Sequence, residues 1–440
     1  MKILNRVISS ILLFIVINSF SILFFKTRWW IIIPFAIVYF LIVNIFPDFK
    51  KQPTFRIKML SDGVELLKLF LITTSLSVLY TVFVGIKMIP AGVHIFTISL
   101  VIVILAESLL FWNGIVRVYG TSIQLGIKWR IIGIVCGWIP IVHIYALVKI
   151  INIATAEAEF EIEKFELNST RKENDICKTR YPLLMVHGVF FRDTRYFNYW
   201  GRIPGELIKN GAVIFYGQQQ SAASVKSSGE ELSNRIKNII KDTGCEKVNI
   251  IAHSKGGLDS RYAISCLGMD QYVASLTTIN TPHKGCIFAD YLLEKVPDKV
   301  RDSIANRYNT ALRKLGDTNP DFIAAITDLA ASQCKIMNET VIDIPGVYYQ
   351  SVGSKMNHAR SGKFPLNIAY PFVLHFDGDN DGLVSAKSAQ WSENFIMISI
   401  HGKRGVSHGD VIDLNRENIR SFDVREFYVS LVEGLKKRGL

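Results

Sequence analysis

The sequence predicts an all-α membrane region followed by an α/β domain with a mostly parallel sheet. Three observations predict this fold class. Apolar residues, which make up 49% of the 440-residue chain, crowd into the first 150 positions. Beyond them, short apolar runs typical of buried strands alternate with helix-like segments. One of these runs ends in a serine-glycine turn that opens a helix.

Five apolar stretches precede residue 151. They are residues 8–25, 29–46, 66–86, 93–112 and 131–148. A helix needs about 20 apolar residues to cross the hydrocarbon core of a bilayer, and each stretch is close to that length. A single stretch could be a buried core helix. Five in succession, with little polar sequence between them, favour a transmembrane region of about five helices over residues 1–150.

The positive charge of the chain is concentrated in this region, which holds 14 of the 50 basic residues but only four of the 38 acidic ones. These basic residues flank apolar runs and form no patch between aromatic residues, so we expect a membrane partner and no nucleic acid. With a cytoplasmic N-terminus, nine basic residues fall in the inner segments and four in the outer ones. The positive-inside rule then places the chain after residue 151 outside the cytoplasm.

Glu107 lies within the fourth apolar stretch. An acidic residue at membrane depth is a functional candidate, because burying its charge is costly. The simpler interpretation is a protonated or helix-paired glutamate near a membrane edge, and we favour it because no partner is obvious. Residues 151–175, which follow the apolar stretches, are polar and rich in glutamate. They predict a juxtamembrane helix or linker.

Residues 176–440 show the alternation of strands and helices. Apolar runs predict strands at 182–186, 212–216, 248–252, 276–279, 346–350, 372–375 and 395–400. Between the second and third strands, Ser227 is expected to cap a helix, with Glu230 as its capping-box partner. That helix would bury Leu232 and Ile236 on one face. Continuous apolar strands separated by helices predict a mostly parallel sheet covered on both faces.

The run VNIIAHSKGG at residues 248–257 carries the strongest chemical signal. A strand that ends in a tight turn and opens a helix is a nucleophile elbow, written G-x-S-x-G in general. The turn needs small neighbours; Ala252 replaces the first glycine and Gly256 supplies the second. A serine-glycine turn in an ordinary strand–helix unit is the alternative, but the context favours Ser254 as a nucleophile.

A serine nucleophile needs a base within hydrogen-bond reach and an acid that orients the base. In this kind of site the order along the chain is serine, acid, histidine. His401 and His408 both follow the plausible acids, and His408 is favoured because it sits in a loop after a strand. Asp377, Asp379 and Asp381 all qualify as the acid by position, in a loop that we expect to follow a strand.

Acyl transfer also requires two N–H donors for the developing oxyanion. One donor is expected to be the backbone N–H of Lys255, directly after the nucleophile. The other is expected to be that of Val189, because Gly188 lets the backbone of this early loop approach closely. His187 is expected to be structural, since it precedes the acid.

Four motifs together resemble the bacterial family I true lipases, which are α/β-hydrolases that cleave triacylglycerols. The motifs are YPLLMVHG at 181–188, VNIIAHSKGG at 248–257, TPHKG at 281–285 and NDGLV at 380–384. They follow the family's order from about residue 181 to residue 414. The resemblance implies an α/β-hydrolase fold over residues 176–440, with Asp381 as the acid and His408 as the base. It also implies a helical lid over residues 287–345.

The sequence departs from these lipases in three ways. Lys387 stands where the family often has a cysteine of a disulfide. The family binds a structural calcium near the base, for which Asp410 matches one ligand and no partner is evident upstream. Family members are usually secreted, whereas here a multi-span region precedes the domain.

The sequence thus predicts a membrane-anchored serine hydrolase that cleaves lipid or other acyl esters through an acyl-enzyme. A phospholipase or an acyltransferase with the same triad remains open, because the acceptor is chosen by the shape of the site. A catalytically silent binding protein and a transporter are weaker alternatives. No cofactor is required, although calcium is possible. The six cysteines form no C-x-x-C pair, which favours free structural thiols.

Overall fold

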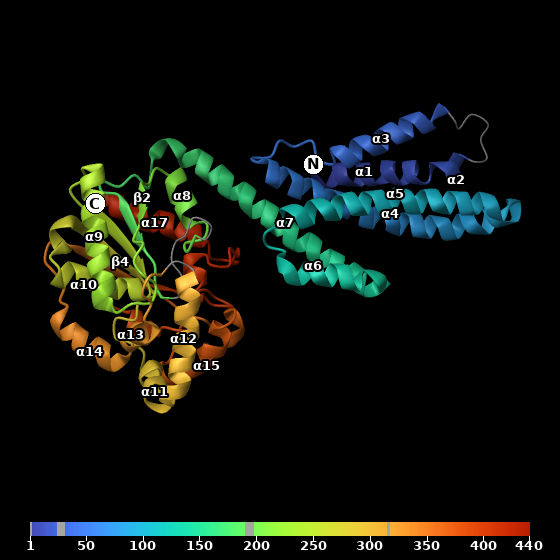
Figure 1. Cartoon of the computed structure of the whole chain (residues 1–440). Coiled ribbons are helices and arrows are strands. Elements are labelled where there is room, and N and C mark those ends of the chain that lie inside the picture. The colour runs from blue at the N-terminus through green and yellow to red at the C-terminus, as the bar shows by residue number, and fades with distance from the viewer. Residues whose placement is uncertain (1, 24–30, 190–197, 315–316) are drawn as a thin grey trace. The chain divides into compact units, whose positions relative to one another are not determined.

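The computed structural model describes the chain except for residues 1, 24–30, 190–197 and 315–316. The described chain divides into two compact units, residues 1–169 and residues 170–440 (Figure 1). Parts of the first two predicted spans, residues 24–25 and 29–30, lie outside the described residues.

The first unit consists of helices. They are α1 (Lys2–Ile17), α2 (Ser19–Leu23), α3 (Ile33–Ile45), α4 (Phe55–Ala91), α5 (Val93–Thr121), α6 (Gly126–Val135) and the first part of α7 (Pro140–Arg171). In the described chain, three helices are long and apolar enough to cross a membrane, over Phe55–Ile86, Val93–Thr121 and Ile141–Asn174. The apolar parts of α1 and α3 are shorter. The structure therefore differs from the expected set of about five similar spans.

The predicted fifth span, residues 131–148, is not one helix. Helix α6 ends at Val135, a short 3₁₀ turn covers Cys136–Trp138, and α7 begins at Pro140. A proline has no backbone N–H and is favoured in the first turn of a helix, where Pro140 stands in α7, so it disfavours one continuous helix from α6. Helix α7 then runs without interruption through the polar residues after 151, because alanine and glutamate are good helix formers. The expected juxtamembrane segment is thus the second half of α7.

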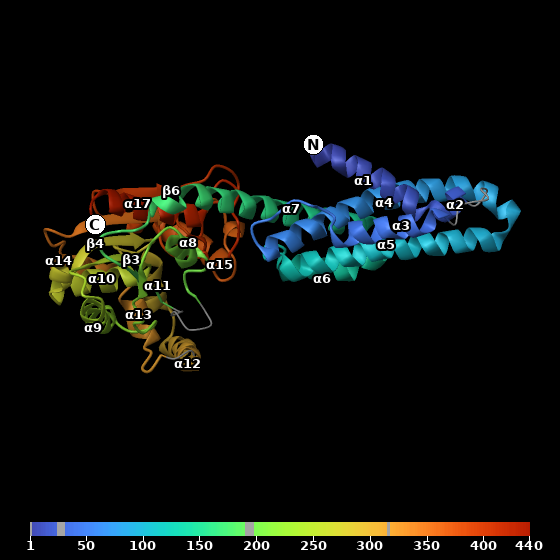
Figure 2. The same ribbon diagram turned by 90° about the horizontal axis from the view of Figure 1, so that it is seen from above.

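Helices α4 and α5 lie side by side as an antiparallel pair in both views (Figures 1 and 2). The chain reverses between them at Gly92, whose φ of 148° favours glycine. Further along the pair, a Cβ added to Gly114 of α5 would stand 2.9 Å from the Leu67 side chain of α4. The absence of a side chain at Gly114 therefore allows the two backbones to approach closely, as small residues do between membrane helices.

The second unit contains a parallel sheet, as predicted. Its strands are β1 (Leu183–Val186), β2 (Ile214–Tyr216), β3 (Val248–His253), β4 (Val273–Ile279), β5 (Tyr348–Ser354) and β6 (Phe395–Ile398). Their order in the sheet is β2-β1-β3-β4-β5-β6, and every neighbouring pair is parallel. Strands β1, β3 and β4 are buried along their whole length, which explains why β1 is continuously apolar and why the other two are mostly so.

Helices cover both faces of this sheet. Leu183 and Met185 of β1 face a core shared with α8 (Ile203–Lys209) and α17 (Val424–Lys437). Leu184 and Val186 face a second core, shared with α9 (Val225–Thr243) and α10 (Lys255–Cys266). Successive side chains of a strand point to opposite faces, so one apolar run serves two cores. The layered α/β-hydrolase fold expected for residues 176–440 is confirmed.

Two local predictions were wrong. Residues 372–375 are not a strand but belong to helix α15 (Leu366–Asp377), because a short apolar run reads equally well as a buried strand or as one face of a helix. The cap of α9 is not Ser227 but Ser224, whose hydroxyl accepts a hydrogen bond from the Ser227 N–H at 3.2 Å. The helix nevertheless buries Leu232 and Ile236 as expected.

Residues 287–345, between β4 and β5, form mainly helices. They are α11 (Ile287–Lys295), α12 (Asp298–Lys314), α13 (Phe322–Thr327) and α14 (Ala331–Thr340). Residues 315–316 of this segment lie outside the described residues. The chain returns to the sheet at β5, and the short helix α16 (Ala386–Ala389) precedes β6.

Candidate active site

Ser254 occupies the turn between β3 and α10, with φ of 54° and ψ of −131°. This left-handed conformation is strained for a residue with a side chain, and such strain clusters at functional sites. The Ser254 N–H donates to the carbonyl of Ile279, the last residue of the neighbouring strand β4, at 2.9 Å. This bond anchors the turn to β4. The side chain is only 9% exposed.

Small residues around Ser254 are a steric requirement of this turn. A Cβ added to Gly188 would stand 2.7 Å from the Cβ of Ser254. A Cβ on Gly256 would collide with the His187 carbonyl, and one on Gly257 with the Thr281 hydroxyl. Glycine at these three positions lets the loop after β1 and the start of α10 pack directly against the serine.

His408 and Asp381 are in direct contact. The His408 Nδ1 lies 2.7 Å from the Asp381 Oδ2, and the carboxylate, which is 0% exposed, can only accept the proton of this bond. The backbones of the two residues are also joined, because the His408 N–H donates to the Asp381 carbonyl at 2.9 Å. The imidazole therefore carries its proton on Nδ1, and its Nε2 is left as the basic atom.

The Asp381 carboxylate is held by further donors. Its Oδ1 accepts hydrogen bonds from the N–H groups of Leu383 at 2.9 Å and Val384 at 2.8 Å. Its Oδ2 also accepts one from the Asn280 side-chain amide at 2.6 Å. Buried charges are tolerated when they are hydrogen-bonded in this way.

His253 connects the histidine to the serine turn. Its ring centroid lies 4.4 Å from that of His408, and it is the residue that precedes Ser254. Its Nδ1 contacts the Tyr199 hydroxyl at 2.7 Å, and that hydroxyl accepts the Gly188 N–H at 3.1 Å. Burial lowers the pKa of His253 well below its usual value, and the nearby His408 lowers it further. A neutral ring therefore stands beside the base.

The structure separates the alternatives that the sequence left open. Asp377 accepts the N–H groups of Ile287 and Phe288, at 3.0 and 3.1 Å, at the start of α11. Asp379 pairs with Lys355 at 2.7 Å. His401 is exposed, whereas His408 is buried against Asp381. Among the candidates, only Asp381 and His408 contact each other.

Asp381 does not follow a strand directly, contrary to our expectation. Helix α15 precedes it, inserted after β5. The loop returns to the end of β5, where the Met356 N–H donates to the Asn380 carbonyl at 2.8 Å. The chain therefore forms helix α15 after β5 and then returns to the carboxyl end of β5, where Asp381 lies.

The two expected N–H donors belong to residues that directly follow Gly188 and Ser254. Val189 is buried directly after Gly188, and Lys255 is the first residue of α10. The Lys255 side chain turns into the protein, where its Nζ pairs with Asp259 at 2.6 Å and donates to the Ser228 hydroxyl at 3.0 Å. Only the backbone of Lys255 is therefore available at the turn.

Sequence reasoning missed Asn280 and Tyr199. Asn280 directly follows the buried strand β4, has φ of 47°, and donates to both Asp381 and Ser354 at 2.6 Å. A polar residue at the carboxyl end of a buried strand was the available signal. Tyr199 gave no such signal, because its contact with His253 depends on the folding of a distant loop.

Asp410 does not provide a calcium site with its neighbours. Its Oδ1 accepts a hydrogen bond from the Arg404 guanidinium at 3.0 Å, and its Oδ2 accepts the Ser407 N–H at 2.9 Å. Arg404 also donates to Glu417 at 2.9 Å. Calcium requires six to eight oxygen ligands, and no group of three metal-ligating side chains occurs among the described residues. A guanidinium already supplies the positive charge, so the residues present do not fit the ion.

The chain is similar to known esterases and lipases. Residues 203–306 match the family described as "Putative serine esterase (DUF676)", a segment that contains Ser254. The chain is 37% identical over 233 residues to the triacylglycerol lipase of Vibrio cholerae, covering 48% of this chain and 74% of that one. It is 32% identical over 299 residues to the triacylglycerol lipase of Pseudomonas fragi, covering 61% of this chain and 100% of that one.

Other matches are partial. The chain spans about half the length of two further triacylglycerol lipases, 53% of one and 48% of the other. The solved structure of Bacillus licheniformis lipase BlEst2 in its mature form matches with a TM-score of 0.44 and 21% identity, covering 58% of this chain and 92% of that one. From its full-length match to the Pseudomonas fragi enzyme, the chain belongs to the triacylglycerol lipase family.

Proposed function

We propose that this protein is a serine hydrolase that cleaves the carboxylic esters of lipids, with Ser254 as nucleophile, His408 as base and Asp381 as the orienting acid. The observation that carries the proposal is the 2.7 Å contact between His408 Nδ1 and Asp381 Oδ2, with the His408 ring beside the residue that precedes Ser254. The names of its relatives, triacylglycerol lipases, support acylglycerols as the substrate class. Within that family, its motifs favour the bacterial family I true lipases.

The proposed reaction has two steps. His408 Nε2 takes the proton of the Ser254 hydroxyl as the oxygen attacks the ester carbonyl, and Asp381 stabilises the imidazolium that forms. The N–H groups of Val189 and Lys255 donate to the oxyanion of the tetrahedral intermediate. The alcohol leaves with the proton of His408, which creates an acyl-enzyme. Water, deprotonated by the same histidine, then releases the fatty acid and restores the serine.

The helices of residues 287–345 are proposed to form the lid over this site. Two observations support this role. The segment lies between β4 and β5 in the sequence. In addition, Asp377, which ends α15 four residues before Asp381, accepts a hydrogen bond from the start of α11. A lid excludes water and contacts the acyl chain when it closes.

The first unit is proposed to anchor the enzyme in a membrane, with the catalytic unit outside the cytoplasm. Three helices of sufficient length and apolar character support the anchor, and the excess of basic residues in the expected inner segments supports the orientation. Protease added to intact cells should then remove residues 170–440. A catalytic unit that stays intact until the cells are lysed would contradict this orientation.

The hydrolase proposal is tested with p-nitrophenyl esters, from acetate to palmitate, and the purified full-length protein. Ser254→Ala should lower kcat by roughly 10⁶-fold, as loss of a serine nucleophile does, and should abolish labelling by a fluorophosphonate. The matched control is Ser260→Ala, which removes another buried hydroxyl, from the helix α10 that directly follows Ser254. It should leave both readouts unchanged. A folded wild-type protein that neither hydrolyses any ester nor takes the label would refute the proposal.

A further inference from the structure

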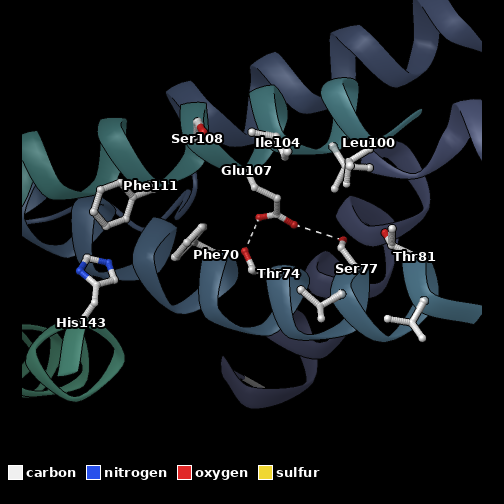
Figure 3. A pocket seen from close by; sticks show the side chains of 13 residues that line it. Phe70, Thr74, Ser77, Thr81, Leu100, Ile104, Glu107, Ser108, Phe111 and His143 are labelled. Carbon is white, nitrogen blue, oxygen red and sulfur yellow. Dashed lines mark hydrogen bonds between the residues drawn. The ribbon is translucent and has the colours of Figure 1, made fainter. Parts of the chain in front are cut away.

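A cavity of about 450 Å³ lies within the first unit, between α4, α5 and the start of α7 (Figure 3). Most of its wall is apolar. The residues that line it are Phe70, Thr74, Ser77, Val78, Thr81, Val82, Leu100, Val103, Ile104, Glu107, Ser108, Phe111 and His143. Sites for small ligands typically have volumes of roughly 300–1,000 Å³ and combine an apolar wall with a few convergent polar groups.

Glu107 supplies the main polar group of this cavity. Its side chain is 6% exposed, and its Oε2 accepts hydrogen bonds from the hydroxyls of Thr73 and Thr74, both at 2.9 Å. The Ser77 hydroxyl approaches Oε1 at 3.3 Å. All three donors belong to the neighbouring helix α4. The sequence alone did not reveal these hydroxyls as partners of Glu107.

The carboxylate retains the capacity to bind another donor. A carboxylate can accept about four hydrogen bonds, and among the described residues Oε1 has only the long contact with Ser77. Figure 3 shows the carboxylate of Glu107 directed toward Thr74 and Ser77 within the cavity. The structure thus presents an acceptor inside an apolar cavity and no cation that would neutralise it among the lining residues.

His143 adds a second polar group to the wall. Its Nδ1 is buried and has no hydrogen-bond partner within the described parts of the chain. The ring lies 5.5 Å from that of Phe111, on the side of the cavity formed by α7. A buried polar atom without a partner is costly, and a ligand hydroxyl would relieve that cost.

We propose that this cavity binds a monoacylglycerol, with its acyl chain along the apolar wall and a glycerol hydroxyl donating to Glu107. A carboxylate favours a neutral head that donates hydrogen bonds and disfavours an anionic fatty acid. The choice of an acylglycerol rests on the proposed lipase function, since hydrolysis of tri- and diacylglycerols yields molecules of this class. The first unit would then hold a partial product of the catalytic unit in addition to anchoring it.

The test uses full-length Ser254→Ala protein, which cannot consume the ligand, in phosphatidylcholine nanodiscs. A monoacylglycerol with a diazirine in its acyl chain is added, irradiated and mapped by mass spectrometry. Labels should concentrate on the cavity-lining faces of α4 and α5. Excess unlabelled monooleoylglycerol should remove them, whereas oleate at neutral pH should not.

Two variants probe the site independently. Glu107→Leu should reduce labelling of the cavity about tenfold or more, as expected for the loss of a hydrogen bond to a charged group. Thr81→Phe retains Glu107 but fills the cavity, and it should reduce labelling similarly. Leu109→Ala, at an exposed position of α5 that does not line the cavity, is the matched control and should label like the parent protein.

Labels spread evenly over the lipid-facing surfaces of α4 and α5, or labelling unchanged in both Glu107→Leu and Thr81→Phe, would overturn the proposal. Hydrolysis of p-nitrophenyl butyrate by the same two variants with Ser254 restored checks that each one folds. It also separates the two proposals. Specific labelling without hydrolysis by the wild type would refute the lipase function alone, and hydrolysis without specific labelling would refute the cavity alone.

Discussion

The Oδ2 atom of Asp381 lies 2.7 Å from the Nδ1 atom of His408 and 2.6 Å from the side-chain amide nitrogen of Asn280. One buried oxygen therefore receives two side-chain donors, while its partner oxygen receives two backbone donors. This arrangement fixes both the carboxylate and the ring, so that the ring orientation does not have to be established during the reaction.

Asp381→Asn should lower kcat by roughly 10⁴-fold, because the amide would stabilise the wrong tautomer of His408 and no longer balance the imidazolium. KM should change little. Asp379→Asn is the matched control from the same loop, since Asp379 pairs with Lys355 and not with a histidine. Steady-state hydrolysis of p-nitrophenyl butyrate measures both. A larger loss in Asp379→Asn than in Asp381→Asn would reverse the assignment.

Asn280→Ala should lower kcat about 10- to 100-fold with little change in KM, as expected for the loss of one hydrogen bond to a charged group. With one donor fewer, the Asp381 carboxylate and the His408 ring are held less firmly in the orientation that the reaction requires. Titration with a fluorophosphonate counts the active sites. A merely structural defect would lower that count, whereas a positioning role lowers kcat for each active site.

Hydrolysis by the wild type should be unaffected by EDTA, because Arg404 occupies the charge-balancing position beside Asp410. Arg404→Gln should lower the free energy of unfolding by about 1–2 kcal/mol, since the buried Asp410 would lose its cation while the partly exposed arginine limits the cost. Lys403→Gln, at an exposed neighbouring position, is the control. Thermal unfolding measures the effect. Loss of activity in EDTA that added calcium restores would contradict this prediction.

The two buried histidines should lower the free energy of unfolding as the pH drops below about 6.5, whereas Asp259, whose pKa burial raises to about 7, acts in the opposite direction. Burial lowers the folded-state pKa of His253 and of His283 well below the usual histidine value. Below pH 6.5 the unfolded chain therefore binds protons that the folded chain does not, which favours unfolding. Each histidine should cost about 1–2 kcal/mol between pH 7 and pH 5.

Urea midpoints for loss of esterase activity at pH 7 and pH 5 measure this effect. His253→Gln should flatten the dependence. His401→Gln should not, because His401 is exposed in the folded protein. A dependence on pH that is as steep in His253→Gln as in the wild type would show that His253 does not titrate as described.

The sequence was sufficient to predict most of the sheet. Strand β1 is a continuous apolar run and β3 is mostly apolar because both of their faces are buried, and this pattern is visible without a structure. The elbow at Ser254 was equally visible, because its strand, its small residues and its helix are all local in the chain. The run 372–375 was misread, since four apolar residues do not distinguish a strand from one face of α15.

The choice among the acids required long-range contacts. Three aspartates lie within five residues of one another, and the sequence alone gives each an equal position. They differ in partners that come from distant segments, namely α11 for Asp377, Lys355 for Asp379 and His408 for Asp381. The resemblance to known lipases selects Asp381, which is the one of these three aspartates that contacts His408.

The sequence by itself determined the order of the two regions, the parallel sheet and the position of the serine turn. These features depend on local periodicity and on the small size of residues near one another in the chain. Only the tertiary structure revealed the support of Asp381 by Asn280, the guanidinium beside Asp410, and the hydroxyls around Glu107. Each of these joins residues of different loops or helices, and such contacts form only when packing brings the elements together.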